Sequence, residues 1–224
     1  MIYFHHIAGA GGRSVIKSFL DYAGDARIFQ VFFHEDGNIV MRGKRFHRSP
    51  QPRRDAFFAC SHAPYYTCEI PPNTFRFTLM RDPITRFGGR YRQHYMALQT
   101  GITTNWVGNN ILECAQQMPQ SVVLRQLAMF SKEFNIEEAL GKLRGLNMVG
   151  RCETMTESLE ALSMQLQLES PLQEFTEQEH STFYGNPKIV ARSRRRVQAE
   201  VCEHYAALQE IFEPEYRLME ALGV

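Results

Sequence analysis

The residues best suited to chemistry lie in a glycine-rich stretch near the start of the chain. Residues 8–14 read Ala-Gly-Ala-Gly-Gly-Arg-Ser and follow an apolar run at residues 2–7, which favours a buried strand. Apolar residues at helical spacing come next, at residues 15–20. Glycines let the backbone approach an anion closely, and the N–H groups at a helix N-terminus point toward it. The sequence therefore predicts a phosphate-binding turn between a strand and a helix.

Arg81 is a second candidate for binding an anion. It follows the apolar run at residues 75–80, and Asp82 and Pro83 come next, which is typical of a helix start. A guanidinium can hold a phosphate through two parallel hydrogen bonds, which an ammonium cannot do. We therefore predict that Arg81 binds an anion while Asp82 caps the helix. A salt bridge between these two residues is the structural alternative.

His62 is the candidate general base. It comes shortly after a predicted strand at residues 56–60, and sites in parallel sheets form at the carboxyl ends of the strands. An imidazole, whose ordinary pKa is about 6.5, suits removal of a proton at neutral pH. The alternative is a histidine that only ends a strand. His5 and His6 lie beside the glycine-rich turn, and one of them is expected to be a packed residue.

Short strands that alternate with helices must position these residues. The predicted strands cover residues 2–7, 27–33, 56–60 and 75–80, with a further short one at residues 147–150. Residues 105–145 and 191–222 have largely helical patterns, the second interrupted near Pro214. This order predicts a single α/β domain over residues 1–224. Helices would cover both faces of a central parallel sheet, and the C-terminal half would be rich in helix.

Composition limits the classes of protein that fit. The 224 residues carry a net charge of +1 at pH 7, which argues against binding nucleic acid or a membrane through bulk charge. The five cysteines include no Cys-x-x-Cys pair, which favours reduced thiols over disulfides or a zinc site. No apolar run approaches the length of about 18 residues that a membrane span needs. The first strand starts at residue 2 and leaves no room for a signal peptide, so we expect a cytoplasmic protein without bound metal.

Three kinds of turn compete for the glycine-rich stretch. A Walker A loop reads Gly-x-x-x-x-Gly-Lys-Ser/Thr, but here Ile7 and Arg13 occupy its first glycine and its lysine positions. A dinucleotide fingerprint reads Gly-x-Gly-x-x-Gly, and Gly9, Gly11 and Ser14 only approach it. A purely structural turn between strand and helix is the third possibility.

The rest of the chain favours a different phosphate ligand. Residues 6–14 resemble the His-Ile-Pro-Lys-Thr-Ala-Gly-Thr-Ser loop of the carbohydrate sulfotransferases, above all the heparan sulfate 2-O-sulfotransferase group and its bacterial relatives. In that family the loop holds the 5′ side of 3′-phosphoadenosine-5′-phosphosulfate (PAPS), the sulfate donor. Residues 77–91 resemble the family's Arg-Asp-Pro-x-x-Arg-Phe-x-Ser-x-Tyr motif, which grips the 3′-phosphate of the donor.

Two further stretches agree with this resemblance. Residues 60–65 are similar to the family's Gly-His-x-Pro-Phe/Tyr stretch, in which the histidine serves as base and here corresponds to His62. Residues 148–159 are similar to a Val-Gly-x-x-Glu-x-Phe-x-Glu-Ser-Leu signature. The resemblance implies a P-loop-like three-layer sandwich and transfer of a sulfuryl group from PAPS to a hydroxyl of a carbohydrate or glycolipid, without a metal.

The resemblance also implies a set of site residues. The catalytic residues would be His62 and Arg13. The donor-binding residues would be Gly9, Ala10, Gly11, Gly12, Arg13, Ser14, Arg81, Arg86, Gly89, Lys188 and Arg192. The last two stand for a basic segment before the final helix, which closes over the nucleotide in the family; a solvated helix start at residues 192–196 is the alternative. The basic residues 42–54 would either attract an anionic acceptor or form a plain exposed loop.

Two departures from the family pattern bear on activity. The family's loop lysine falls on Gly9, so Arg13 would have to supply the cation near the leaving phosphate. The family's serine that contacts the 3′-phosphate falls on Gly89, and Arg86 or Arg90 could compensate. A non-catalytic descendant that binds PAPS or its product is therefore one alternative. A P-loop-type nucleotide kinase is the other, disfavoured because the Walker lysine and a clear magnesium-binding aspartate are missing.

Overall fold

The computed structural model describes residues 1–24, 29–32, 52, 54–101, 104–175 and 187–224. Its strands are β1 (Ile2–His5), β2 (Phe29–Phe32), β3 (Phe58–Ser61), β4 (Phe75–Met80) and β5 (Met148–Arg151). The helices of the first half are α1 (Gly12–Ala23), the 3-10 turn η1 (Tyr65–Thr67) and α2 (Pro83–Gln99). Those that follow are α3 (Ile111–Gln117), α4 (Gln120–Val123), α5 (Arg125–Phe130), α6 (Ile136–Arg144), α7 (Met155–Gln165), α9 (Pro187–Glu203) and α10 (Tyr205–Leu222).

The described strands form one parallel sheet in the order β2-β3-β1-β4-β5. Strand β1 lies between β3 and β4, with Ile2 opposite Phe58 on one side and Phe75 on the other. The carboxyl ends of parallel strands meet at one edge of the sheet. The segments that leave β3, β1 and β4 therefore begin side by side.

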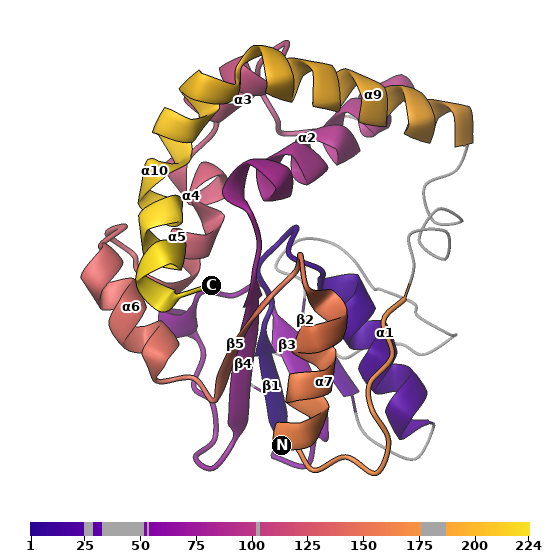
Figure 1. Ribbon diagram of the computed structural model, residues 1–224, viewed down its shortest axis with the longest axis vertical. Coiled ribbons are helices and arrows are strands. Elements are labelled where there is room, and N and C mark those ends of the chain that lie inside the picture. The colour runs from indigo at the N-terminus through magenta and orange to yellow at the C-terminus, as the bar shows by residue number, and fades with distance from the viewer. Residues whose placement is uncertain (25–28, 33–51, 53, 102–103, 176–186) are drawn as a thin grey trace.

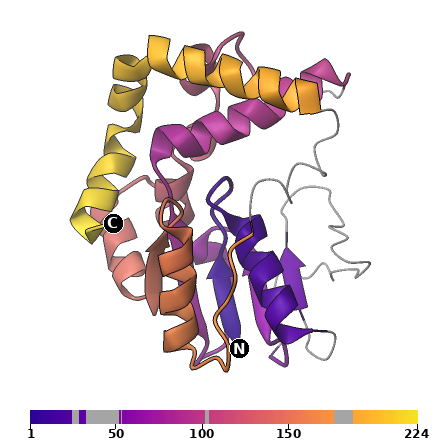
Figure 2. The same ribbon diagram turned by 45° about the vertical axis from the view of Figure 1, so that its right-hand side comes forward.

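Helices cover both faces of this sheet. Helices α1 and α7 lie on one face, where Phe19 and Leu159 pack with strand residues such as Phe4 and Phe77 (Figures 1 and 2). A second cluster joins the other face to helices α2, α3, α5, α6 and α10. Strands β1 and β3 are buried at every position, which accounts for the near-continuous apolar runs from which these strands are predicted.

The C-terminal helices form an arm over the upper part of the molecule. Helix α9 packs along α2, and α10 turns down beside α6 (Figure 1). The predicted interruption near Pro214 is wrong, because the break falls at His204 and α10 continues through the proline. Leu208 and Phe212 before Pro214, and Leu218 after it, are all buried in one cluster, and this packing holds the helix on both sides of the proline.

The predicted α/β class, the parallel sheet and the helix-rich second half are confirmed. The resemblance implies that residues 192–196 belong to a basic loop before the last helix. The structure instead places them inside helix α9. Most of the basic stretch at 42–54 lies outside the described residues. None of the described helices combines the length and the apolar character needed to cross a bilayer.

Candidate functional site

The turn between β1 and α1 depends on two glycines with positive φ. Gly9 has φ +89° and Gly11 has φ +69°, a region that side chains with a Cβ rarely adopt. A Cβ at Gly11 would lie 2.7 Å from Cys152 Sγ, so the turn is also packed tightly against the segment after β5. Ala10 is buried, and its N–H donates to the carbonyl of Ile7 at 3.1 Å. Ala10 therefore stabilises the conformation of the turn.

Helix α1 begins at Gly12, directly after the turn. No side chain at Gly11 caps the helix, so its first turn carries the partial positive charge of a helix N-terminus without a local acidic residue. Arg13 is partly buried there, and Ser14 is largely buried. This arrangement suits an anion, as the sequence predicts.

The turn between β4 and α2 lies against the β1–α1 turn. Arg81 Nη1 donates to the carbonyl oxygen of Gly9 at 2.9 Å. A Cβ at Gly9 would come within 3.1 Å of the Arg86 carbonyl and 3.3 Å of Arg90 Cγ, so the two turns are in close contact. A Cβ at Gly89 would lie 3.9 Å from Arg81 Nη1, which places Gly89 beside the same guanidinium. The structure thus brings Arg81, Gly89 and the glycine-rich turn together.

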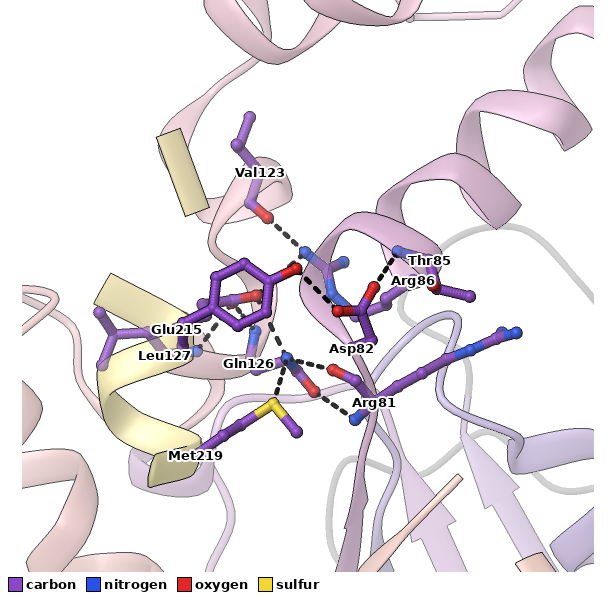
Figure 3. Close-up of polar contacts among 10 residues, drawn as sticks. Arg81, Asp82, Thr85, Arg86, Val123, Gln126, Leu127, Glu215 and Met219 are labelled. Atoms are coloured by element: carbon purple, nitrogen blue, oxygen red, sulfur yellow. Dashed lines mark hydrogen bonds and ion pairs between the residues drawn. The ribbon is translucent and has the colours of Figure 1, made fainter. Parts of the chain in front are cut away.

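The backbone of Arg81 is held by the buried side chain of Gln126. The Arg81 N–H donates to Gln126 Oε1 at 2.8 Å, and Gln126 Nε2 donates to the Arg81 carbonyl at 2.9 Å. The Arg81 side chain extends away from this contact, as Figure 3 shows. Asp82 caps α2 as predicted, because its Oδ1 accepts the N–H of Thr85 at 2.7 Å. Its Oδ2 accepts the hydroxyl of Tyr216 at 2.7 Å, which ties α10 to the same turn.

His62 lies at the same edge of the sheet, just beyond β3. Its Nε2 is 3.0 Å from Nδ1 of His6, and the two ring centroids are 4.3 Å apart. Arg125 Nη2 donates to the His62 carbonyl at 2.5 Å. Three adjacent strands therefore present His62, the glycine-rich turn and Arg81 in that order across the sheet.

His6 is the buried member of the histidine pair. Its ring stacks on Phe4 at 5.2 Å, and a Cβ at Gly12 would lie only 1.8 Å from its Nε2. Burial, with smaller contributions from the charges of Arg90, Arg13 and Arg125, lowers the pKa of His6 to about 3. His6 is therefore neutral at physiological pH.

Arg86 lies next to the glycine-rich turn, but its guanidinium is enclosed in the core. Its side chain is 1% exposed, pairs with Glu215 at 3.5 Å and donates to the carbonyl of Val123 (Figure 3). A guanidinium enclosed in this way connects α2 with α10 and α4. Arg86 is therefore assigned a structural role, in place of the predicted contact with a nucleotide.

Lys188 and Arg192 lie apart from the turn. Both are exposed on α9, and in both views the first turns of this helix stand away from the β1–α1 turn (Figures 1 and 2). A hollow of about 520 Å³ lies along α9, lined by Pro187, Val190, Ala191, Arg194 and Arg195. The structure does not join this basic helix to the predicted site.

The sequence patterns do not identify two residues that contact this edge of the sheet. Arg125 and Gln126 come from a helical stretch with no motif, and their partners lie far along the chain at His62 and Arg81. Within the described ranges, no three His, Cys, Asp or Glu side chains converge as metal ligands would.

No protein-family model matches the sequence, and no curated protein matches it significantly. The geometry of the sheet edge is therefore the ground on which a function can be proposed.

Proposed function

We propose that this chain is a PAPS-dependent sulfotransferase that acts on a hydroxyl of a carbohydrate or glycolipid. The observation that carries the proposal is the 2.9 Å hydrogen bond from Arg81 to Gly9, which joins the two turns of the proposed donor site. In this reading the fold is P-loop-like, the β1–α1 turn holds the 5′ phosphosulfate and Arg81 holds the 3′-phosphate. Arg81 has further donors available, because a guanidinium carries five N–H groups.

The proposed reaction is an in-line displacement at sulfur. The acceptor oxygen attacks sulfur, the bond from sulfur to the bridging phosphate oxygen breaks, and adenosine 3′,5′-bisphosphate leaves. The acceptor's proton passes to His62. Positive charge must offset the charge on the leaving phosphate, as in phosphoryl transfer. Arg13, in the first turn of α1, is the proposed source of that charge.

Gly9 explains why the cation would come from Arg13. A lysine at Gly9 would need φ +89° and would meet the Arg86 carbonyl at 3.1 Å from its Cβ. The turn therefore disfavours the family's lysine at this position, and a cation must come from elsewhere. The same observation favours the non-catalytic alternative, a protein that binds the nucleotide without transferring sulfate.

Binding of adenosine 3′,5′-bisphosphate tests the donor site. We expect a thermal shift of a few degrees at saturating nucleotide, and weaker binding of AMP, which lacks the 3′-phosphate. Arg81→Ala should lower affinity about tenfold or more, because hydrogen bonds to charged groups contribute about 1.5–3 kcal/mol. Arg195→Ala, on exposed α9, is the matched control and should bind as the wild type does. Equal affinity for both nucleotides would refute the donor site, and a shift with ATP and magnesium alone would favour a kinase.

Sulfate transfer to a panel of carbohydrate and glycolipid acceptors tests the reaction. His62→Ala should abolish transfer and leave nucleotide affinity unchanged. Loss of both would make His62 a structural residue. Nucleotide binding without transfer to any acceptor by the wild-type chain would support the non-catalytic alternative.

A further inference from the structure

We propose that His6 is a positioning residue for His62: it accepts a hydrogen bond from His62 Nε2, so that His62 takes up a proton at Nδ1. The contact between His62 Nε2 and His6 Nδ1 measures 3.0 Å. The identity of the reaction rests on the proposed function, whereas the state of the histidine pair can be measured without it.

The surroundings of His6 keep its ring neutral. Its imidazole is 5% exposed and wedged between Phe4 and the backbone of Gly12. A proton on His6 would place a positive charge close to three arginines: Arg13 of α1, Arg90 of α2 and Arg125 of α5. His6 therefore stays neutral while a nearby group gains a proton.

The polarity of the contact follows from that neutrality. When His62 binds a proton, both of its ring nitrogens carry hydrogen and can only donate. Nδ1 of neutral His6 must then be the acceptor. The same polarity before protonation leaves the lone pair of His62 on Nδ1, the nitrogen that does not face His6. With the opposite polarity, His62 Nε2 accepts from His6 and His62 has no lone pair left for a substrate proton.

Contacts with α1 and α5 hold the two histidines in place. His6 is fixed by Gly12, where any larger residue would collide with its ring. His62 is fixed through its carbonyl by Arg125. The described charged groups that act on His6 are arginines, which keep their charge across the accessible pH range. The charge of these arginines around His6 is therefore constant between pH 5 and 9.

Two variants separate positioning from packing. His6→Leu keeps an apolar side chain but removes the acceptor, whereas His6→Asn keeps an acceptor near the place of Nδ1. His5→Leu is the matched control, because His5 is equally buried but faces Tyr65 and Phe130.

Nitrogen-detected NMR of the His62 ring is the deciding measurement, and it needs no substrate. We expect the wild-type ring to carry its neutral proton on Nε2. In His6→Leu the pKa of His62 should fall by about one unit or more, since a hydrogen bond that stabilises the charged ring is lost. His6→Asn should restore most of the difference, and His5→Leu should change nothing. A neutral His62 with its proton on Nδ1, or an unchanged titration in His6→Leu, would overturn the proposal.

Kinetics give a second readout if the chain transfers sulfate. His6→Leu should lower kcat about tenfold or more, as expected for a poorly oriented base, and move the acidic limb of its pH profile downward. Affinity for adenosine 3′,5′-bisphosphate should not change. A His6→Leu variant that keeps wild-type kcat would also overturn the proposal, whereas failure of nucleotide binding in the wild type would refute only the proposed function.

Discussion

At the scale of single residues, the end of β1 places two histidines in opposite environments. The ring of His6 faces His62, whereas that of His5 lies among Tyr3, Tyr65 and Phe130 at centroid distances of 4.8, 5.1 and 5.9 Å. Within the described part of the chain, neither ring nitrogen of His5 has a hydrogen-bond partner. Burial, with a smaller contribution from Arg76, lowers the pKa of His5 to about 3.

This burial makes the stability of the protein depend on pH. Between about pH 6.5 and pH 3 the unfolded chain binds a proton at His5 and the folded chain does not. The contribution of neutral His5 to the free energy of unfolding is therefore fully present above pH 6.5. It is lost progressively as the pH falls toward 3, by about 1.4 kcal/mol per pH unit at most. His5→Phe keeps a ring in the aromatic cluster and should remove the share of the slope that comes from His5, while the share of buried His6 remains. Urea unfolding at several pH values from 7.5 to 5 measures it, and an unchanged slope would contradict the assignment.

At the scale of elements, one carboxylate of α10 organises the turn that carries Arg81. Glu215 Oε1 accepts the N–H groups of Gln126 and Leu127 at 2.6 and 3.2 Å, at the start of α5. Its Oε2 pairs with Arg86 of α2 at 3.5 Å. Because Gln126 also holds the Arg81 backbone, α10 reaches the proposed donor site through α5 (Figure 3).

Glu215→Gln should therefore destabilise the fold strongly. It leaves the Arg86 guanidinium buried without a counter-charge, which typically costs about 3–5 kcal/mol. Glu213→Gln removes the exposed partner of Arg217 on the same helix and should change the free energy of unfolding by no more than about 0.5 kcal/mol. Chemical denaturation of the two variants gives the comparison, and equal effects would mean that the buried pair contributes no more than a surface one.

The same elements show what can be predicted from the sequence. The strands, the glycine-rich turn and the Asp82 cap are local patterns, so apolar runs and turn residues reveal them. The role of Arg86 depends on Glu215, a partner far along the chain, and no local pattern distinguishes a buried arginine from a ligand-binding one. The pairing of His6 with His62 likewise joins segments that are distant in the sequence.

At the scale of the whole molecule, the single-domain prediction rests on the sheet that the two apolar clusters share. Phe19 of α1 packs on Phe58 and Phe77 on one face. Phe212 of α10 packs on Phe87 of α2 within the cluster of the other face. Neighbouring strand residues, such as Leu79 and Met80, contribute to opposite clusters. Loss of one cluster should therefore expose the strands on which the other is built.

Because the two clusters share the sheet, we expect the chain to unfold in one cooperative transition. Trp106 is the single tryptophan, and its ring centroid lies 5.2 Å from that of Phe87. Its fluorescence therefore reports the unfolding of the cluster on the α2 face. Phe19→Ala acts on the other face and should cost about 3–5 kcal/mol. In urea, Phe19→Ala should lower the midpoint of the Trp106 fluorescence transition and that of the far-UV circular dichroism transition by the same amount, because a two-state domain unfolds as one unit. Phe212→Ala, on the Trp106 face, should shift both signals together in the same way. A Phe19→Ala variant whose circular dichroism transition moves while its fluorescence transition stays in place would show that the two faces unfold independently, and residues 1–224 would then comprise more than one domain.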